Sequence, residues 1–469
     1  DAGQAVLVAP PGAGKTTVVP LRLLDEPWLD GRRIVVLEPR RLATRAAARR
    51  MASLLGEEVG ATAGYSTRDE RRVGRGTRIE VVTEGILTRR LQHDPSLPGV
   101  GLVVFDELHE RNLHADLGLA LVLDARPALR PDLRLLAMSA TLEAARVATL
   151  LGDAPVVTSE GRAHEVVVRW LPTPPRERLD RAVTAAVRRA VREEPGDVLV
   201  FLPGAGDIRR VEAALTGQGV LPPDVDVRPL FGALPVAAQD AALAPSPPGR
   251  RRVVLATDIA ETSLTVEGVR VVVDSGQART PRFDARSGLT RLQTGPISRA
   301  SAEQRAGRAG RLGPGVAYRL WSKFEHAARR PHPDPEILTV DLAGLALELG
   351  VWGADPASLP FLDQPPRRAL DEAASLLRML GAVDVEGRPT SLGRAMAELP
   401  LHPRLACMVA GAVDAGAGWT ACVVAALLED RDVLRGRPDD LPTDVAVRVS
   451  LIAGIADARA HPLADNGAV

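Results

Sequence analysis

The sequence AVLVAPPGAGKTT, residues 5–17, joins a short apolar run to a glycine-rich loop that opens a helix. The glycines let backbone N–H groups turn toward a polyphosphate, and the helix N-terminus adds a favourable dipole. Lys15 is placed to reach the β- and γ-phosphates as a point charge, and Thr16 to put its hydroxyl on Mg²⁺. The alternative, a plain glycine-rich turn, is disfavoured by the strand–loop–helix context. The predicted nucleotide-binding residues of this Walker A loop are Gly12, Ala13, Gly14, Lys15, Thr16 and Thr17.

A second apolar strand ends in two carboxylates, in the sequence VVFDELH at residues 103–109. At this position Asp106 is expected to hold Mg²⁺ and Glu107 to polarise the attacking water, as in a Walker B motif. Thr16, Asp106 and Glu107 are therefore the predicted metal-site residues. His109, a weaker signal on its own, is placed to couple the water site to a neighbouring domain.

Apolar, β-branched runs alternate with helical stretches up to about residue 320, which predicts parallel sheets buried on both faces. The pattern occurs twice, so we expect two α/β domains, joined near Val156–Arg176. The expected strands are Ala5–Ala9, Ile34–Glu38, Ile79–Thr83, Leu102–Asp106 and Leu133–Ser139, then Val198–Leu202, Val225–Leu230, Val253–Thr257 and Val269–Asp274. Amphipathic helices are expected over Asp341–Gly350, Pro366–Leu380 and Leu392–Ala397, with a small hairpin at Gly381–Pro389 and mostly helix from Arg404 onward.

The second α/β domain lacks a Walker A loop but contains the sequence QRAGRAGR at residues 304–311. Arginines three apart on a helix share a face. Arg308 and Arg311 are therefore interpreted as arginine fingers that reach across a cleft, with Gln304 near the attacking water. The alternative is a solvated basic helix face.

Three shorter motifs follow strands, and each is weaker evidence for a functional site. Ser139-Ala140-Thr141 is either a capped turn or a relay of the nucleotide state between domains. The segments Glu38–Arg41 and Thr83–Gly85 lie where loops at the carboxyl edge of a parallel sheet meet ligands. Taken singly, each of these two is better explained as a capped turn than as a binding site.

Composition limits how the 469-residue chain holds a partner. Lys+Arg and Asp+Glu both number 59, which argues against a polybasic tail that binds nucleic acid, so any phosphate must be held by locally placed groups. Lys15 and Lys323 are the only lysines. No apolar run is long enough to span a membrane, no signal peptide is found, and two cysteines favour a reducing, cytoplasmic setting.

Together these blocks resemble superfamily 2 helicases of the DEAH-box group, here with Asp-Glu-Leu-His, and most of all the bacterial HrpB-like helicases. The resemblance implies two tandem RecA-like doubly wound parallel-sheet domains, then a winged-helix and a helical, ratchet-like region. The expected boundaries are 1–160, 161–325, 326–398 and 399–469, the last truncated because HrpB-like proteins are longer. The sequence blocks that show the resemblance are Leu37–Leu42, Val81–Leu87, Phe105–Leu113, Phe201–Gly204, Ala256–Thr265 and Gln304–Arg311.

The resemblance implies a monomeric motor that hydrolyses Mg²⁺–ATP, or another NTP, and moves 3′-to-5′ on single-stranded nucleic acid, with RNA favoured over DNA. The alternatives are an NTPase that remodels protein–RNA complexes without processive unwinding, a DNA-directed translocase, and a non-catalytic nucleotide switch. Ser275–Ile297 matches the family's strand-separating β-hairpin. The implied nucleic-acid-binding residues are Arg40, Thr83, Glu84, Gly85, Gly204 and Thr262.

Two positions depart from the family pattern. DEAH helicases stack the base between an arginine and an aromatic residue, but here Arg50 faces Leu243, which predicts weak selectivity among NTPs. Asp258 stands where asparagine is common, and a carboxylate there should repel a phosphate unless it is paired or solvated.

Overall fold

The computed structural model describes residues 3–10, 12–139, 144–160, 164–171, 177–262, 266–284, 289–429, 432–434, 436 and 440–454. It divides into two compact units. The first comprises Asp1–Val340 with Leu359–Gln364, and the second Asp341–Ser358 with Pro365–Val469. The predicted nucleotide site belongs wholly to the first unit.

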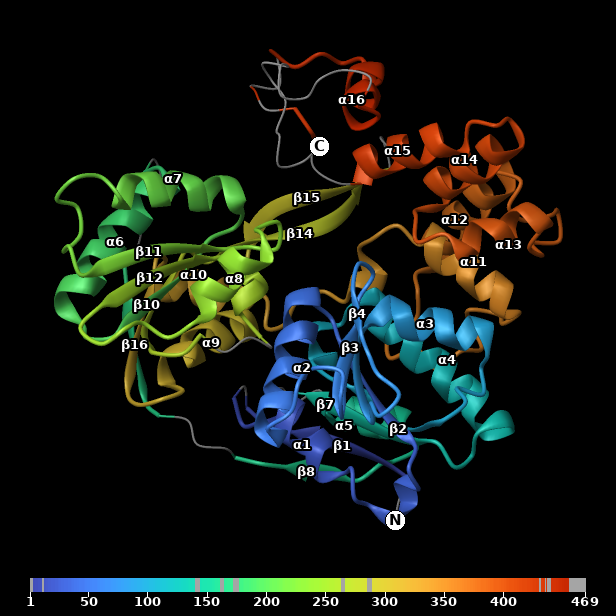
Figure 1. Ribbon diagram of the computed structural model, residues 1–469, viewed down its shortest axis with the longest axis horizontal. Helices are drawn as coiled ribbons and strands as arrows, with labels where there is room; N and C mark the ends of the chain where they lie inside the picture. Colours follow the sequence, from blue (N-terminus) through green and yellow to red (C-terminus); the bar gives the residue numbers. More distant parts are fainter. Residues whose placement is uncertain are drawn as a thin grey trace. The chain divides into compact units, whose positions relative to one another are not determined.

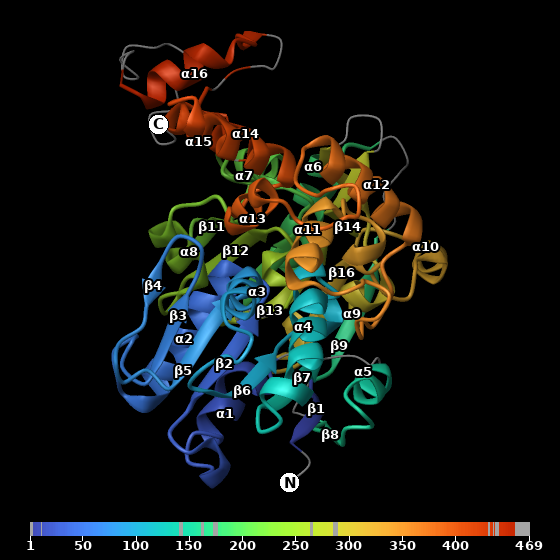
Figure 2. The same ribbon diagram turned by 90° about the vertical axis from the view of Figure 1, so that its right-hand side faces the viewer.

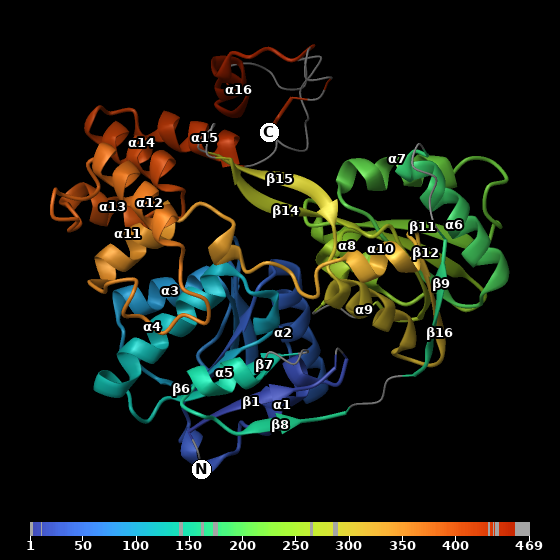
Figure 3. The ribbon, with the colours of Figure 1, turned by 180° about the vertical axis from the view of Figure 1, so that it is seen from behind.

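The first sheet has eight strands in the order β4-β3-β5-β2-β6-β7-β1-β8, parallel except for the β3–β4 pair. Helices α1 and α2 lie on one side of the strands and α3 and α4 on the other (Figure 1). The strands are β1 Gln4–Val8, β2 Arg33–Glu38, β3 Ala63–Ser66, β4 Arg71–Arg72, β5 Ile79–Thr83, β6 Val100–Phe105, β7 Arg134–Ser139 and β8 Val156–Thr158. The helices are α1 Lys15–Arg22, α2 Arg41–Leu55, α3 Glu84–His93, α4 Leu113–Leu129 and α5 Ala144–Leu150, the last beside β1 and β8 (Figure 3).

The second sheet, also in the first unit, is fully parallel in the order β11-β12-β10-β13-β16-β9. Its strands are β9 Val166–Trp170, β10 Asp197–Phe201, β11 Val225–Leu230, β12 Arg251–Ala256, β13 Val269–Asp274 and β16 Gly315–Arg319. The helices are α6 Leu179–Glu193, α7 Ala205–Leu215, α8 Val236–Leu243, α9 Arg299–Gly307 and α10 Lys323–Ala328.

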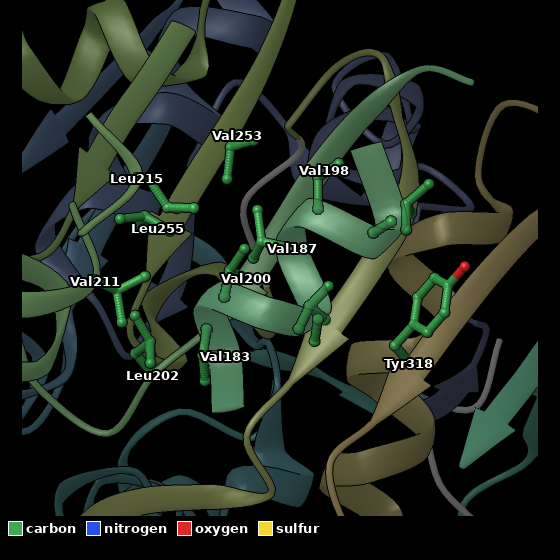
Figure 4. Packing of buried hydrophobic residues seen from close by; sticks show 14 of the residues in the cluster. Val183, Val187, Val198, Val200, Leu202, Val211, Leu215, Val253, Leu255 and Tyr318 are labelled. Atoms are coloured by element: carbon green, nitrogen blue, oxygen red, sulfur yellow. The ribbon is translucent and has the colours of Figure 1, made fainter. Parts of the chain in front are cut away.

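Alternate residues of each central strand enter two different cores, because successive side chains of a strand point to opposite faces. Val198 and Val200 of β10 pack with α6 and α7 (Figure 4). Leu199 and Phe201 belong to the core on the other face of the sheet. This core also contains Leu42 from α2 of the first domain. A continuous apolar run is therefore what this buried strand requires.

All nine predicted strands are present, with ends within two residues of the expected ones. The predicted linker Val156–Arg176 is wrong in part, because β8 and β9 fall inside it. Both are edge strands with half-exposed valines, such as Val157 at 55% and Val167 at 50%, so they lack the apolar signal of a central strand. Pro172–Pro175, the proline-rich part of that stretch, lies outside the described residues.

The predicted hairpin is present as β14 Gln277–Asp284 and β15 Leu289–Pro296, paired antiparallel from Gln277 and Pro296 outward (Figure 3). Figure 2 labels β14 in a view turned by 90°. Residues 285–288 between them lie outside the described part of the chain. The first unit continues past the expected boundary at 325 to Val340 and includes the short turn Glu336–Leu338.

The second unit is helical, as expected. At Gly381–Pro389 the predicted hairpin is reduced to one bridge, Val383 to Pro389. Leu347, Leu377 and Met396 meet in its core. Among the described helices, none is both long and apolar enough to cross a bilayer. The helices are α11 Ala343–Trp352, α12 Arg367–Met379, α13 Ser391–Glu398, α14 Pro403–Asp414, α15 Gly418–Glu429 and α16 Val445–Ile452.

Candidate nucleotide and nucleic-acid site

The Walker A loop leaves the end of β1 and enters α1 at Lys15. Gly12 and Gly14 have φ angles of +88° and +83°, a region that favours glycine. A Cβ on Gly14 would also lie 3.0 Å from the side chain of Val18. The loop therefore needs glycine at both positions, as the sequence predicts, while Pro11 lies outside the described residues.

Lys15 meets both predicted Walker B carboxylates at this edge of the sheet. Its Nζ donates to Oε2 of Glu107 at 3.0 Å and lies 3.9 Å from Oδ1 of Asp106. Burial raises the pKa of Asp106 to about 6, against the opposing effect of Lys15. Burial also disfavours the charged form of Glu107, but Lys15 and His109 outweigh it and lower its pKa. Glu107 is thus held as a carboxylate, the form that can accept a proton from water.

The Thr16 hydroxyl donates to Oδ2 of Asp106, next to the Walker A loop. A hydroxyl and a carboxylate side by side are the hard oxygen ligands that Mg²⁺ prefers in nucleotide sites. The donor set therefore fits the expected metal.

Glu107 adopts an unusual backbone conformation, with φ of +50°. A non-glycine residue in this region costs about 1–3 kcal/mol, and such strain is concentrated at functional sites. Glu107 directly precedes the short turn Leu108–Glu110, which contains His109. His109 Nε2 lies 3.3 Å from Oε2 of Glu107 and 2.8 Å from Nε2 of Gln304 on α9. A continuous line of contacts thus runs from Lys15 on α1 of the first domain to Gln304 on α9 of the second.

The two predicted arginine fingers take different positions. The helix predicted for them ends at Gly307, and Arg308–Gly310 form a tighter turn. The Arg308 guanidinium donates to the carbonyls of Glu261 and Thr262 within the second domain. Arg311 extends to the Walker A loop, where a Cβ on Gly12 would lie 3.4 Å from its Nε. Burial lowers the pKa of Arg311 to about 10, which leaves it charged at neutral pH.

The two residues of the expected base-binding pair have different surroundings. Arg50 is exposed on α2, whereas Leu243 packs partly against the core of the second domain. Neighbouring residues join the two helices instead, since Arg49 pairs with Asp240 at 2.9 Å.

Two of the implied nucleic-acid-binding residues line a cavity of about 370 Å³ between the domains of the first unit. Arg40 lies 3.1 Å from Asp258 and 3.4 Å from Glu110, and Thr262 donates its hydroxyl to Glu110. Despite the cost of burial, these carboxylates raise the pKa of Arg40. Asp258 is therefore paired, which answers the objection that its charge would stand alone near a phosphate.

The remaining implied residues lie at strand and helix ends. Thr83 precedes α3, Glu84 is its buried first residue, and a Cβ on Gly85 would meet open space. Gly204 precedes α7, and a Cβ there would lie 2.8 Å from the Arg279 guanidinium. Ser139 ends β7 in the core, while Ala140 and Thr141 lie outside the described residues.

Comparison with known proteins places this geometry in a family. A DEAD/DEAH box helicase model matches residues 2–150, a helicase conserved C-terminal domain model matches 180–313, and a winged-helix helicase-associated (HA2) model matches 373–401. The chain is 51% identical over 430 residues to the ATP-dependent RNA helicase HrpB of Escherichia coli. It belongs to the DEAH-box helicases.

Further matches also extend along most of the chain. The HrpA homolog of Haemophilus influenzae is 36% identical over 448 residues, covering 93% of this chain and 34% of that protein. The crystal structure of E. coli DEAH/RHA helicase HrpB superposes with a TM-score of 0.87 and 47% identity, over 97% of this chain and 59% of that one. The alignment with E. coli HrpB covers 92% of this chain but 53% of the relative, so the chain spans about half of that protein.

Sequence reasoning missed one residue of this DEAH-box site. Glu110 contacts both Arg40 and Thr262, and nothing in its local sequence marks it beyond its place directly after the Asp-Glu-Leu-His motif. Glu336 accepts from the backbone N–H of Leu113 at 2.9 Å and interacts electrostatically with Glu110.

Proposed function

We propose that the chain is an ATP-dependent helicase motor that moves 3′-to-5′ on single-stranded RNA and hydrolyses Mg²⁺–NTP between its two RecA-like domains. The observation that carries this proposal is the line Lys15–Glu107–His109–Gln304, because it joins a phosphate-binding lysine to a group on the other domain. A non-catalytic nucleotide switch would not need a buried, ionised Glu107 in that line.

Hydrolysis follows from the position of each group. The Walker A backbone and Lys15 would hold the β- and γ-phosphates. Thr16 with Asp106 would hold Mg²⁺, which would screen the phosphate charge when bound. Glu107 takes a proton from the attacking water, while His109 and Gln304 orient the carboxylate and the water. Arg308 and Arg311 stabilise the charge that develops on the γ-phosphate.

Movement follows from the charge that hydrolysis removes. The γ-phosphate attracts Lys15 from one domain and Arg311 from the other, so the loaded cleft is closed, and phosphate release lets it open. Arg40, Thr83, Gly85, Gly204 and Thr262 hold the sugar–phosphate backbone, and Glu84 contributes through its backbone because its side chain is buried. The β14–β15 hairpin separates the strands.

Selectivity among nucleotides should be weak. The base has an exposed Arg50 on one side and, at Leu243, no aromatic ring on the other. Since an aromatic stack on a base contributes about 1–3 kcal/mol, we expect GTP and CTP to be hydrolysed with kcat/KM within about tenfold of ATP. Steady-state kinetics with the four NTPs measure this, and ATP preferred by more than that margin would contradict it.

The test of the function is strand displacement on matched RNA and DNA duplexes with 3′ or 5′ overhangs, run beside NTPase assays. We expect unwinding of the RNA duplex with a 3′ overhang and NTPase stimulation by single-stranded RNA. Stimulation without displacement would favour the remodelling alternative, and a preference for DNA the DNA-directed one. No hydrolysis with any nucleic acid would contradict the proposal.

A further inference from the structure

Glu110 holds the two side chains that the proposed function assigns to RNA phosphates. Its carboxylate accepts from the Thr262 hydroxyl on the second domain and lies 3.4 Å from the Arg40 guanidinium on the first. A carboxylate and a phosphate diester are both anions that only accept hydrogen bonds, so they compete for the same donors. The side chain is 16% exposed and borders the cavity of about 370 Å³, so an entering ligand can reach these donors.

We infer that Glu110 stands in for a backbone phosphate when RNA is absent, and that an RNA phosphate displaces it and thereby signals to the NTP site. This inference rests on the proposed function, because it takes Arg40 and Thr262 as RNA ligands.

The displaced residue is tied directly to the water-activating one. The backbone N–H of Glu110 donates to the carbonyl of Glu107 at 2.8 Å and closes the single turn that also carries His109. Positive φ angles of +50° at Glu107 and +53° at Arg111 bound this turn on both sides. A turn strained at both ends is held by its contacts, so loss of the Arg40 and Thr262 contacts shifts the carbonyl and side chain of Glu107.

Thr262, the partner of Glu110 on the second domain, also contacts a predicted arginine finger. The carbonyl of Thr262, whose hydroxyl binds Glu110, accepts from the Arg308 guanidinium. Burial raises the pKa of Glu84 and of Glu336, and the nearby charge of Glu110 adds to the rise in both. One exchange of anions thus acts on Glu107 from the first domain and on Arg308 from the second.

Asp258 provides an internal comparison. It also pairs with Arg40, at 3.1 Å, so its charge competes with a phosphate as well. It belongs to the turn Asp258–Ala260 of the second domain and has no bond to the Glu107 turn among the described residues. Asp258 should therefore weaken RNA binding without carrying the signal.

The experiment compares Glu110→Gln with a matched control, Glu80→Gln, in the whole chain. Glu80 likewise accepts from one hydroxyl and one guanidinium, those of Ser66 at 2.6 Å and Arg90 at 2.5 Å, but lies outside the cavity. Anisotropy of a labelled oligouridylate without nucleotide gives the RNA affinity. The ratio of NTPase rates with and without saturating RNA gives the stimulation, and thermal melting confirms folding.

We expect Glu110→Gln to bind RNA about tenfold more tightly and to lose most of the RNA stimulation, because the competing charge and the signal are lost together. Glu80→Gln should keep both within about twofold, and Asp258→Asn should gain affinity but keep its stimulation. A purely structural role for Glu110 would weaken RNA binding. Unchanged or weaker binding by Glu110→Gln, or full stimulation, overturns the inference. Wild-type protein that binds no RNA overturns the proposed function itself.

Discussion

Replacing Glu107 with glutamine should leave NTP binding intact and lower kcat for hydrolysis about 10²–10⁴-fold, the range for loss of a general base. The amide has the shape of the carboxylate but cannot take a proton from water. Lys15, which donates to Glu107 at 3.0 Å, keeps an acceptor in the amide oxygen. Single-turnover hydrolysis measures kcat, and titration with a fluorescent nucleotide measures affinity.

The matched control is Glu58→Gln, which neutralises an exposed carboxylate on the first domain that has no side-chain bond among the described residues. It should hydrolyse NTP at the wild-type rate. If Glu107→Gln keeps more than about a tenth of wild-type kcat, another group activates the water and the assignment of Glu107 is wrong.

The second large effect is expected from Arg311→Ala, which should lower kcat about 10³-fold with a smaller change in nucleotide affinity. Arg311 comes from the second domain and lies against Gly12 of the Walker A loop, where we propose that the phosphates bind. Its charge is worth most in the transition state, when negative charge builds on the transferred phosphoryl group.

Arg311 is a cleaner test of the fingers than Arg308. The Arg308 guanidinium donates to two backbone carbonyls, of Glu261 and Thr262, so its removal also leaves buried acceptors without a partner. Arg188→Ala on the exposed face of α6 serves as the control for loss of one arginine. Equal rates for Arg311→Ala and Arg188→Ala would show that Arg311 is not a finger.

The sequence predicts Lys15, Asp106 and Glu107 because each follows a strand with a strong local signal. Residues in the loop after β1 and after β6 meet at one edge of a parallel sheet, so Lys15 and Glu107 are near each other in any such fold. The same logic fails at the sheet edges. Val167 is half exposed, so the sequence of β9 lacks the apolar pattern of a buried strand and is predicted to be part of the linker.

The contacts that Glu110 and Asp258 make between the domains were outside the reach of sequence reasoning. Glu110 has meaning only beside Arg40 and Thr262, which are 70 and 152 residues away along the chain. The Asp258–Arg40 pair is of the same kind and depends on how the two domains meet. Patterns within one segment report burial and turns, whereas these pairs depend on packing between segments.

The zero net charge now has a structural counterpart. The cationic groups expected to meet phosphates already face carboxylates, as Lys15 faces Glu107 and Arg40 faces Glu110 and Asp258. These cationic side chains are paired with carboxylates inside the cleft, so an entering polyanion must displace the carboxylates to reach them. Lys15, one of only two lysines, stands where a compact charge is required.

The central claim, that NTP is hydrolysed by groups from both domains under the control of RNA, is tested most directly by single-turnover release of the γ-phosphate from ATP. The measurement compares the wild type, Glu107→Gln and Arg311→Ala, each with and without single-stranded RNA. We predict rapid release by the wild type that RNA accelerates, and slow release by both variants with or without RNA. Wild-type release no faster than that of Glu107→Gln, or indifferent to RNA, would contradict the account.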